Sequence, residues 1–163
     1  MARRCIFCTI ARGEEPKTTL LHEDERFVAF RDRSPAAAHH YLIIPKEHMG
    51  NPATLTNKDI PLVESLAEVG NKVLQEQGGN MEDKRLGFHW PPFNSIDHLH
   101  LHVLSPDSQM GFLSRLVYRP AFWFVTIDKL LERLQAVPGD QQPSPPSSTS
   151  QQQSETKAEG EQS

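Results

Sequence analysis

The sequence predicts an α+β domain: an antiparallel sheet of about five strands with one long helix and a short C-terminal helix. Short apolar runs bounded by turn residues are typical of strands, and apolar residues recur at helical spacing over residues 60–78. Histidines alternate with aliphatic residues from His98 to Leu104, which is a strand pattern. Because strands precede and follow the long helix instead of alternating with helices, an antiparallel sheet is favoured.

The N-terminal part contains one helical turn and three predicted strands. Cys5 to Arg12 is expected to be helical, and Gly13 and Pro16 end it. A charged turn, Glu23 to Arg26, separates the first two strands as in a hairpin. The strands cover residues 18–22, 27–32 and 40–45.

The long helix is predicted from its start signal and its apolar period. Asp59 is expected to cap it, and Pro61 falls in the first turn, where a missing N–H does no harm. Gly78 and Gly79 mark its end. The apolar positions that should lie on the sheet are Ile60, Val63, Leu66, either Val69 or Gly70, and Val73.

Downstream of this helix we expect two more core strands, a final extended segment and a short helix. The strands are residues 85–88 and 98–104, with a Pro-containing loop at 90–95 between them. The extended segment is 122–127, and Asp128 is expected to cap an amphipathic helix that reaches Leu134.

Composition divides the 163 residues into one folded domain and two appendages. Residues 5–137 are long enough for a single core, and residues 1–4 are expected to be a flexible N-terminus. Residues 138–163 consist largely of Pro, Ser, Gln, Thr and Glu without an aliphatic anchor. We predict that this tail is disordered, because it cannot bury enough apolar surface to offset its ordering entropy.

Charge and hydropathy exclude some partners. The net charge is -4, and no run of Lys and Arg is interleaved with aromatics, so binding along a nucleic-acid backbone is not expected. There is no apolar stretch long enough for a membrane span and no signal-peptide pattern at the start. Together with the Cys5-x-x-Cys8 pair, this predicts a reducing compartment, the cytoplasm with passive access to the nucleus.

The alternating histidines are the strongest functional signal. In a strand, His98, His100 and His102 share one face while Leu99, Leu101 and Val103 share the other. Imidazole serves as a nucleophile or acid/base near neutral pH, and it is also the commonest metal ligand. From the residues alone, covalent catalysis and a metal centre both remain open.

These segments resemble the histidine triad family. The stretch from His98 to Leu104 matches the family signature of three histidines alternating with aliphatics, and Phe27–Pro35, His40–His48 and Cys5–Cys8 resemble the family's other segments in the same order. The preceding Leu86–His89 and the later Phe122–Phe124 are most similar to the Hint branch. That branch comprises adenosine 5'-monophosphoramidases, and its members are typically homodimers.

The resemblance implies a reaction and a role for each matching residue. His100 would be the nucleophile that forms an AMP–histidine intermediate, with His98, His102 and His40 supporting it. Ser95 matches a hydroxyl that binds the phosphate and leaving group, and Asp32 a carboxylate that binds the ribose. The substrates would be purine nucleotide derivatives: AMP-NH2, AMP-lysine, similar adenylated amines or acyl-adenylates. The implied nucleotide contacts are Asp32, Arg33, Ser95, His100, Leu101 and His102.

Some relatives with Cys-x-x-Cys at this point hold a zinc ion. In this chain the corresponding ligands are Cys5, Cys8, His48 and His98, a set of two sulfurs and two nitrogens that suits tetrahedral zinc. The alternative is a pair of small buried cysteines. The resemblance implies no cofactor for catalysis itself, so the zinc would be structural.

Three other functions compete with hydrolysis of the P–N bond. The histidines could be ligands of a catalytic metal, or the fold could serve as a nucleotide-binding scaffold with weak turnover. Leu86–His89 also resembles aprataxin, which removes adenylate from DNA ends, but the zinc finger and basic surface of that enzyme have no counterpart here. We therefore expect a small adenylated substrate and a homodimer or higher homo-oligomer, without nucleic acid or membrane.

Overall fold

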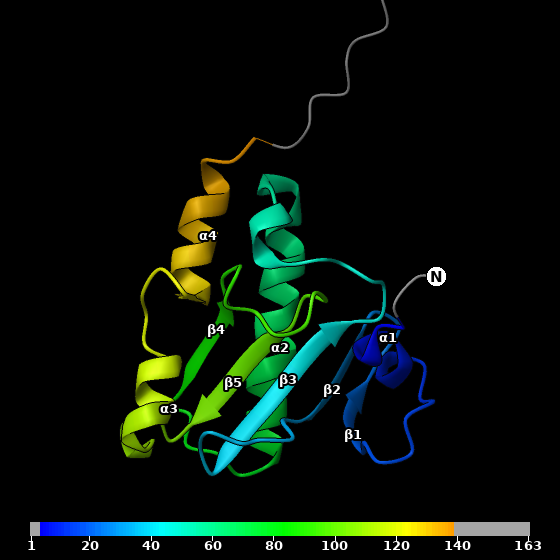
Figure 1. The fold of residues 1–163 in the computed structure, drawn as a ribbon, viewed down its shortest axis with the longest axis vertical. Helices are drawn as coiled ribbons and strands as arrows, with labels where there is room; N and C mark the ends of the chain where they lie inside the picture. The colour runs from blue at the N-terminus through cyan, green and yellow to red at the C-terminus, as the bar shows by residue number, and fades with distance from the viewer. Residues whose placement is uncertain (1–3, 139–163) are drawn as a thin grey trace, which may run out of the picture.

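The computed structural model describes residues 4–138, which form one antiparallel sheet with helices on both faces (Figure 1). The predicted α+β class is confirmed, with six strands in place of about five, in the order β1-β2-β3-β5-β4-β6. The predicted appendages lie outside the described residues, apart from Arg4 and Pro138. The strands are β1 (Leu20–Glu23), β2 (Phe27–Arg31), β3 (His39–Pro45), β4 (Arg85–His89), β5 (Leu101–Ser105) and β6 (Phe124–Thr126). The helices are α1 (Ile6–Ala11), α2 (Ile60–Glu76), α3 (Phe112–Val117) and α4 (Ile127–Gln135), with 3-10 turns at Pro52–Thr54, Asn57–Asp59 and Asp107–Gln109.

The main core lies between one face of the sheet and the helices α2 and α4. Leu66 and Val73 of α2 are buried against it, as their helical spacing predicts. The predicted capping by Asp59 is wrong in detail, because its carboxylate accepts a hydrogen bond from the Thr56 amide (2.8 Å) and makes none to the start of α2. Thr56 instead caps the preceding 3-10 turn. Within residues 4–138, no helix is both long and apolar enough to cross a bilayer.

The opposite face of the sheet carries a smaller apolar cluster beside the histidines. Phe7 and Ile10 of α1 pack there against Phe30 of β2 and Leu42 of β3. Leu42 is the register partner of His102 across the β3–β5 ladder. Paired residues of antiparallel strands project on the same face, so α1 and the apolar cluster form one side of the histidine site.

The predicted strand from His98 is shorter than expected, because β5 begins at Leu101. The ladder with β3 stops at the Ile43–Leu101 pair. Beyond it, Pro45 has no amide hydrogen to donate, and its carbonyl accepts the ring N–H of His98 (2.9 Å). His98 and His100 therefore lie in the segment that enters β5.

The region after β5 contains a helix that the sequence pattern did not reveal. The helix α3 has six residues, and none of them is buried. Phe112, Leu113, Leu116 and Val117 do recur at helical spacing, but a run of six residues is too short for that period to stand out. The predicted extended segment 122–127 is reduced to β6, which pairs with β4. The C-terminal helix α4 is present, with Thr126 at its N-cap position and Asp128 in its first turn.

Gly87 is a test of how closely β4 and β6 approach. A Cβ atom at this position would lie 2.5 Å from the carbonyl oxygen of Val125 and 2.6 Å from the ring of Phe124. Because a backbone oxygen cannot move aside cheaply, Gly87→Ala should lower the free energy of unfolding by about 2 kcal/mol, measured by chemical denaturation. Gly111→Ala, which meets nothing within 4 Å, should leave it nearly unchanged, and equal effects of both variants would contradict this packing.

Candidate active site

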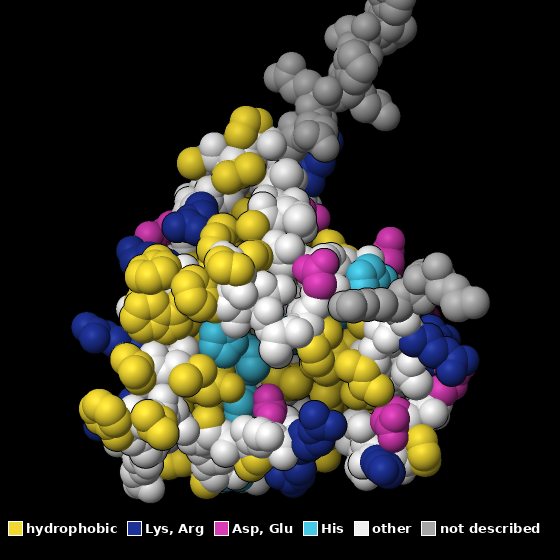
Figure 2. Space-filling view, viewed as in Figure 1, with side chains coloured by type: hydrophobic (Ala, Val, Ile, Leu, Met, Phe, Trp, Pro, Cys, Tyr) yellow, Lys and Arg dark blue, Asp and Glu magenta, His cyan; other side chains and the backbone are white. Residues whose placement is uncertain are grey.

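Five histidines meet on the face of the sheet that α1 partly covers, three of them from neighbouring strands and two from the segment that enters β5. Figure 2 shows histidine side chains at the floor of a hollow, bordered by hydrophobic side chains on both sides. His40 comes from β3, His89 from β4 and His102 from β5, while His98 and His100 precede β5. The three predicted triad residues are therefore together, although only His102 belongs to a strand.

The hydrogen bonds of His100 determine which of its nitrogens can react. Its Nδ1–H donates to the carbonyl oxygen of His98 at 2.6 Å, which leaves the lone pair of a neutral ring on Nε2. The ring is 8% exposed and packs edge-on against Phe7 at 5.1 Å between centroids. Burial lowers the pKa of His100, and the neighbouring His89 and His98 lower it further. His100 is thus held as a neutral imidazole, the form that can act as a nucleophile.

A directed chain of hydrogen bonds fixes the other histidines. The Ala36 amide donates to Nδ1 of His40 (3.0 Å), so the proton of neutral His40 is on Nε2 and points to Nδ1 of His102 (3.0 Å). By the same reasoning Nε2–H of His102 points to Nδ1 of His89 (3.3 Å), and Nε2–H of His89 donates to the carbonyl of Val117 (3.2 Å). Every ring in the chain is neutral with a defined tautomer.

Among residues 4–138, Asp32 is the carboxylate that lies beside this chain of rings. Its Oδ2 lies 3.5 Å from Nε2 of His40, and its Oδ1 accepts the amide of Ser34 at 2.7 Å. Burial lowers the pKa of His40 to about 4, against the opposing attraction of Asp32. For His102, burial and the adjacent His100 and His40 hold the pKa well below its usual range. Burial therefore keeps the histidines uncharged at neutral pH despite Asp32. The carboxylate of Asp32 is partly exposed and can still accept a hydrogen bond from a ligand hydroxyl.

The other predicted nucleotide contacts occupy different positions around the hollow. Ser95 lies in the exposed loop before His98, and Arg33 is exposed in the turn after Asp32. The side chain of Leu101 is fully buried in the main core on the far face of the sheet. Only the main chain of Leu101 is thus on the histidine side, whereas the hydroxyl of Ser95 and the guanidinium of Arg33 are accessible to a ligand.

Tyr118, at the end of α3, is a site residue that the sequence analysis missed. Its ring centroid lies 5.0 Å from that of His89, 5.2 Å from His102 and 5.3 Å from His40. Its carbonyl accepts a hydrogen bond from Nη1 of Arg85 at 2.8 Å, which ties the end of α3 to β4. No residue pattern links Tyr118 to the triad, so the signal lay only in the tertiary structure. His89 belongs to the same group; the family resemblance leaves open whether it approaches the phosphate and leaving group or only packs at the end of a strand.

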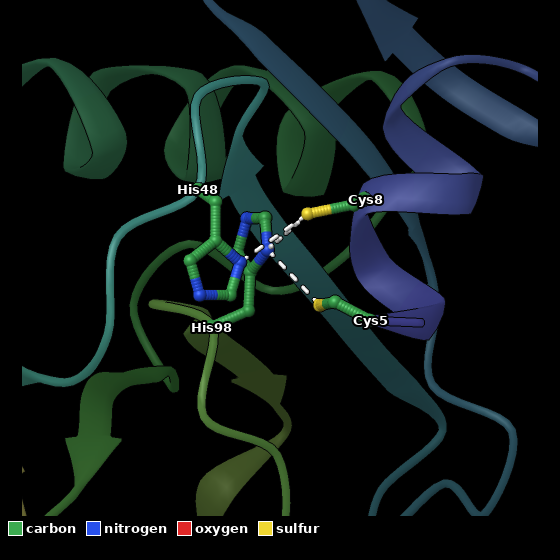
Figure 3. Close-up of side chains that lie close together, drawn as sticks. All are labelled: Cys5, Cys8, His48 and His98. Carbon is green, nitrogen blue, oxygen red and sulfur yellow. Dashed lines mark hydrogen bonds between the residues drawn. The ribbon is translucent and has the colours of Figure 1, made fainter. Parts of the chain in front are cut away.

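The two cysteines and two histidines predicted as zinc ligands form a second cluster (Figure 3). The sulfur of Cys5 lies 3.4 Å from Nδ1 of His98, and that of Cys8 lies 3.5 Å from the same atom and 3.2 Å from Nδ1 of His48. Tetrahedral zinc at ordinary bond lengths sets its sulfur and nitrogen ligands about 3.6 Å apart. Nε2–H of His98 donates to the carbonyl of Pro45, so the lone pair on Nδ1 of the same ring faces the sulfurs. This set of four donor atoms fits zinc.

Asp32, His40 and His102 also bring three donor atoms within 4.8 Å of one another. Their hydrogen bonds do not suit a metal. The lone pair of His40 is on Nδ1, where it accepts the Ala36 amide, and its Nε2 carries the proton that faces Asp32 and His102. A cation at this place would require His40 to change tautomer and lose the amide, so the geometry favours acid/base or nucleophilic chemistry over a metal centre.

Comparisons with known proteins agree with this geometry. The protein family described as "Scavenger mRNA decapping enzyme C-term binding" matches residues 4–118. The chain is 52% identical to adenosine 5'-monophosphoramidase HINT3 of Xenopus tropicalis, over 81% of this chain and 88% of that protein. It is 50% identical to HINT3 of Mus musculus, over 80% and 81% respectively. Among solved structures, a histidine triad protein from Clostridium difficile matches 64% of this chain and 92% of its own, with 36% identity and a TM-score of 0.58.

Because the buried histidines have lowered pKa values, the fold should lose stability in acid. The unfolded chain takes up protons near pH 6.5, whereas His40 in the fold does so only near pH 4. The contribution of neutral His40 to the free energy of unfolding is therefore fully present above pH 6.5 and is lost as the pH falls from 6.5 toward 4. His40 alone accounts for on the order of 3 kcal/mol.

Chemical denaturation between pH 4 and 8 would measure this dependence. His40→Gln removes the titrating ring and should flatten the slope between pH 6.5 and 4. A wild-type stability that stays constant or rises over that interval would show that the histidines are not held neutral.

Proposed function

This chain belongs to the histidine triad family, and we propose that it is a hydrolase that cleaves the P–N bond of adenosine 5'-monophosphoramidates. The observation that carries the proposal is the state of His100: a neutral ring, with Nδ1–H committed to the His98 carbonyl and Nε2 carrying the lone pair. The names of the related enzymes from Xenopus tropicalis and Mus musculus support the same substrate class.

The reaction proceeds in two steps through an AMP–histidine. Nε2 of His100 attacks the α-phosphorus and forms an N–P bond. The P–N bond to the leaving group breaks, its electron pair stays on nitrogen, and that nitrogen takes a proton from the imidazole cluster. Water then attacks the phosphorus, the bond to His100 breaks, and the cluster recovers its proton from that water. The products are AMP and a free amine.

The surrounding residues divide the work of binding. Nε2–H of His102, which points to His89 in the free protein, turns to a phosphate oxygen, and Ser95 donates to the phosphate from the opposite loop. Asp32 accepts the ribose hydroxyls, and Phe7 contacts the base beside His100. Arg33, exposed in the turn after Asp32, would contact the outer edge of the nucleotide.

Zinc is the second part of the proposal, as a structural ion held by Cys5, Cys8, His48 and His98. It would join α1 to the segment before β5 and fix the ring of His98, whose carbonyl holds His100. The ion takes no part in the chemical steps, which use the imidazoles alone.

Self-association is a further part of the proposal, as a homodimer or higher homo-oligomer. The edge of the sheet supports it, because β6 pairs with β4 only from Gly87 to His89 and leaves Arg85 and Leu86 without a strand beyond them. An open strand edge is suited to pairing with a second copy. The cytoplasmic and nuclear localisation expected from the sequence stays a prediction.

His100→Ala should abolish hydrolysis of adenosine 5'-phosphoramidate while nucleotide binding is kept, because the sugar and base contacts are elsewhere. Loss of a covalent nucleophile costs several powers of ten in kcat. The measurement is AMP release in chelator-treated buffer, with intact-mass detection of an adenylyl adduct on rapidly quenched wild type. His39→Ala is the control: His39 precedes His40 in β3 and points to the opposite face of the sheet, so this variant should stay active. Activity of His100→Ala within a few fold of wild type, or activity that requires a divalent metal, would overturn the assignment.

Purified protein should contain about one zinc per chain. Cys5→Ser combined with Cys8→Ser should lose the metal and melt at a lower temperature, since structural zinc contributes to folding directly. Elemental analysis and thermal unfolding test both points, and Arg12→Ser at the exposed end of α1 is the control that should keep the metal. Wild-type protein free of zinc, with a double variant of unchanged stability, would leave the cysteines as packing residues.

A further inference from the structure

An apolar surface begins at the catalytic histidines and continues outward on the β4–β6 side of the hollow. We call it the leaving-group wall, formed by Phe93, Val117, Tyr118 and Phe122. It touches the site directly, because the carbonyl of Val117 accepts Nε2–H of His89 and the ring of Tyr118 packs on His89 and His102. Val117 and Tyr118 therefore border the pocket in which the phosphate would bind. Phe122 is joined to them through Trp123, whose ring packs against Phe122 at 4.9 Å and whose Nε1–H donates to the carbonyl of Leu116.

The outer part of the wall is held in place although it faces solvent. The rings of Phe93 and Phe122 meet edge to face at 5.6 Å, yet they are 51% and 75% exposed. The segment that carries Phe122 is fastened to α3, because Nε1–H of Trp123 donates to the carbonyl of Leu116 at 3.2 Å. Exposed apolar side chains fixed beside a pocket mark a binding surface more often than chance exposure does. Figure 2 shows hydrophobic side chains gathered beside the histidines over α3 and the chain that follows it.

The two sides of the hollow differ in what they can bind. The aromatic rings of Phe7 and Phe30 lie on the α1 side of His100, which is where the base binds under the proposed function. Asp32, the proposed ribose contact, lies beside His40, at 3.5 Å between Oδ2 and Nε2. The leaving group must then lie on the opposite side of the hollow, next to β4 and β6. In residues 112–123 the only charged side chains are Arg115 and Arg119, so that stretch offers no carboxylate to a cationic leaving group.

From this placement we infer that the leaving-group wall is a subsite for the departing part of the substrate, and that it selects apolar groups. The substrate class is an adenylate whose amine or acyl portion carries an aromatic or aliphatic chain without a positive charge. This inference rests on the proposed function and narrows it, because AMP-lysine, with its cationic leaving group, would be a poorer substrate than an arylalkyl amide.

Three adenosine 5'-phosphoramidates test the inference: those of propylamine, 3-phenylpropylamine and 1,3-diaminopropane. Burial of part of a phenyl ring on the wall should raise kcat/KM for the phenylpropyl compound about tenfold over the propyl compound. The diaminopropane compound, with its free ammonium, should be no better than the propyl compound. Phe122→Ser and Phe93→Ser should each lower kcat/KM for the phenylpropyl compound more than for the propyl compound, and so reduce the phenylpropyl preference.

Phe112→Ser is the matched control, because Phe112 is 82% exposed and lies at the other end of α3 from Tyr118. It should retain the preference. Equal kcat/KM for the phenylpropyl and propyl compounds in wild type would overturn the inference. So would a Phe122→Ser variant that dissociates an oligomer without changing the preference, since the wall would then be a contact between copies.

A binding measurement separates failure of the inference from failure of the proposed function. If wild type hydrolyses none of the three compounds, the proposed function fails and the wall can still be judged by calorimetry. His100→Ala should bind the phenylpropyl compound about tenfold more tightly than the propyl compound, and adding Phe122→Ser should remove the difference. Equal affinities would overturn the inference independently of turnover.

Discussion

The hydrogen bond from Nδ1–H of His100 to the carbonyl of His98 is the interaction on which the site depends. The bond is 2.6 Å long and joins residues two positions apart in the chain. It places the single N–H of the neutral ring on Nδ1 and leaves the lone pair on Nε2. The carbonyl stays in position because the ring of His98 is itself anchored, by Pro45 on one nitrogen and by the cysteine cluster on the other. The reactivity of Nε2 of His100 therefore depends on where β3 ends, at Pro45, and where β5 begins, at Leu101.

The end of the β3–β5 ladder explains why the anchors are where they are. A regular ladder would use the carbonyl of Pro45 for a backbone partner, but the ladder stops two residues earlier at Ile43. The carbonyl of Pro45 then accepts a hydrogen bond from the ring of His98, and the carbonyl of Met49 accepts one from the amide of Leu99 at 2.7 Å. Loss of regular pairing thus places two polar rings in the interior without leaving their donors unsatisfied.

Burial of several imidazoles together has an electrostatic consequence. Each ring lowers the pKa of its neighbours in addition to the effect of desolvation, so His40, His100 and His102 all favour the neutral form. Neutral rings can form a chain of donors and acceptors, which protonated rings cannot, because both nitrogens would be donors. The chain from the Ala36 amide to the Val117 carbonyl requires this charge state, and the fold favours the same state.

Sequence patterns were sufficient where one local rule decides the outcome. The period of α2 and the shared face of the triad follow from spacing, and the apolar run predicted as a strand over 40–45 is observed as His39–Pro45. The cysteines and histidines that the family resemblance implied as zinc ligands also lie together. The start of β5 was misplaced, because alternation indicates which way side chains point and not where backbone pairing stops. The helix α3 was missed because its apolar period extends over only six residues. Tyr118 was missed because its contact with the histidines depends on the path of the chain after β5. The side chain of Leu101 lies in the core, as its alternation with the histidines required.

The tautomer of His100 in solution is the most direct test of this account. Long-range correlation between ring protons and nitrogens on 15N-labelled protein at neutral pH distinguishes the two neutral tautomers from the charged ring, with the resonance assigned by its loss in His100→Ala. The account predicts a neutral ring protonated on Nδ1 for His100, and rings protonated on Nε2 for His98 and His89. A His100 ring that is charged, or protonated on Nε2, would contradict the assignment of its Nε2 as the attacking atom.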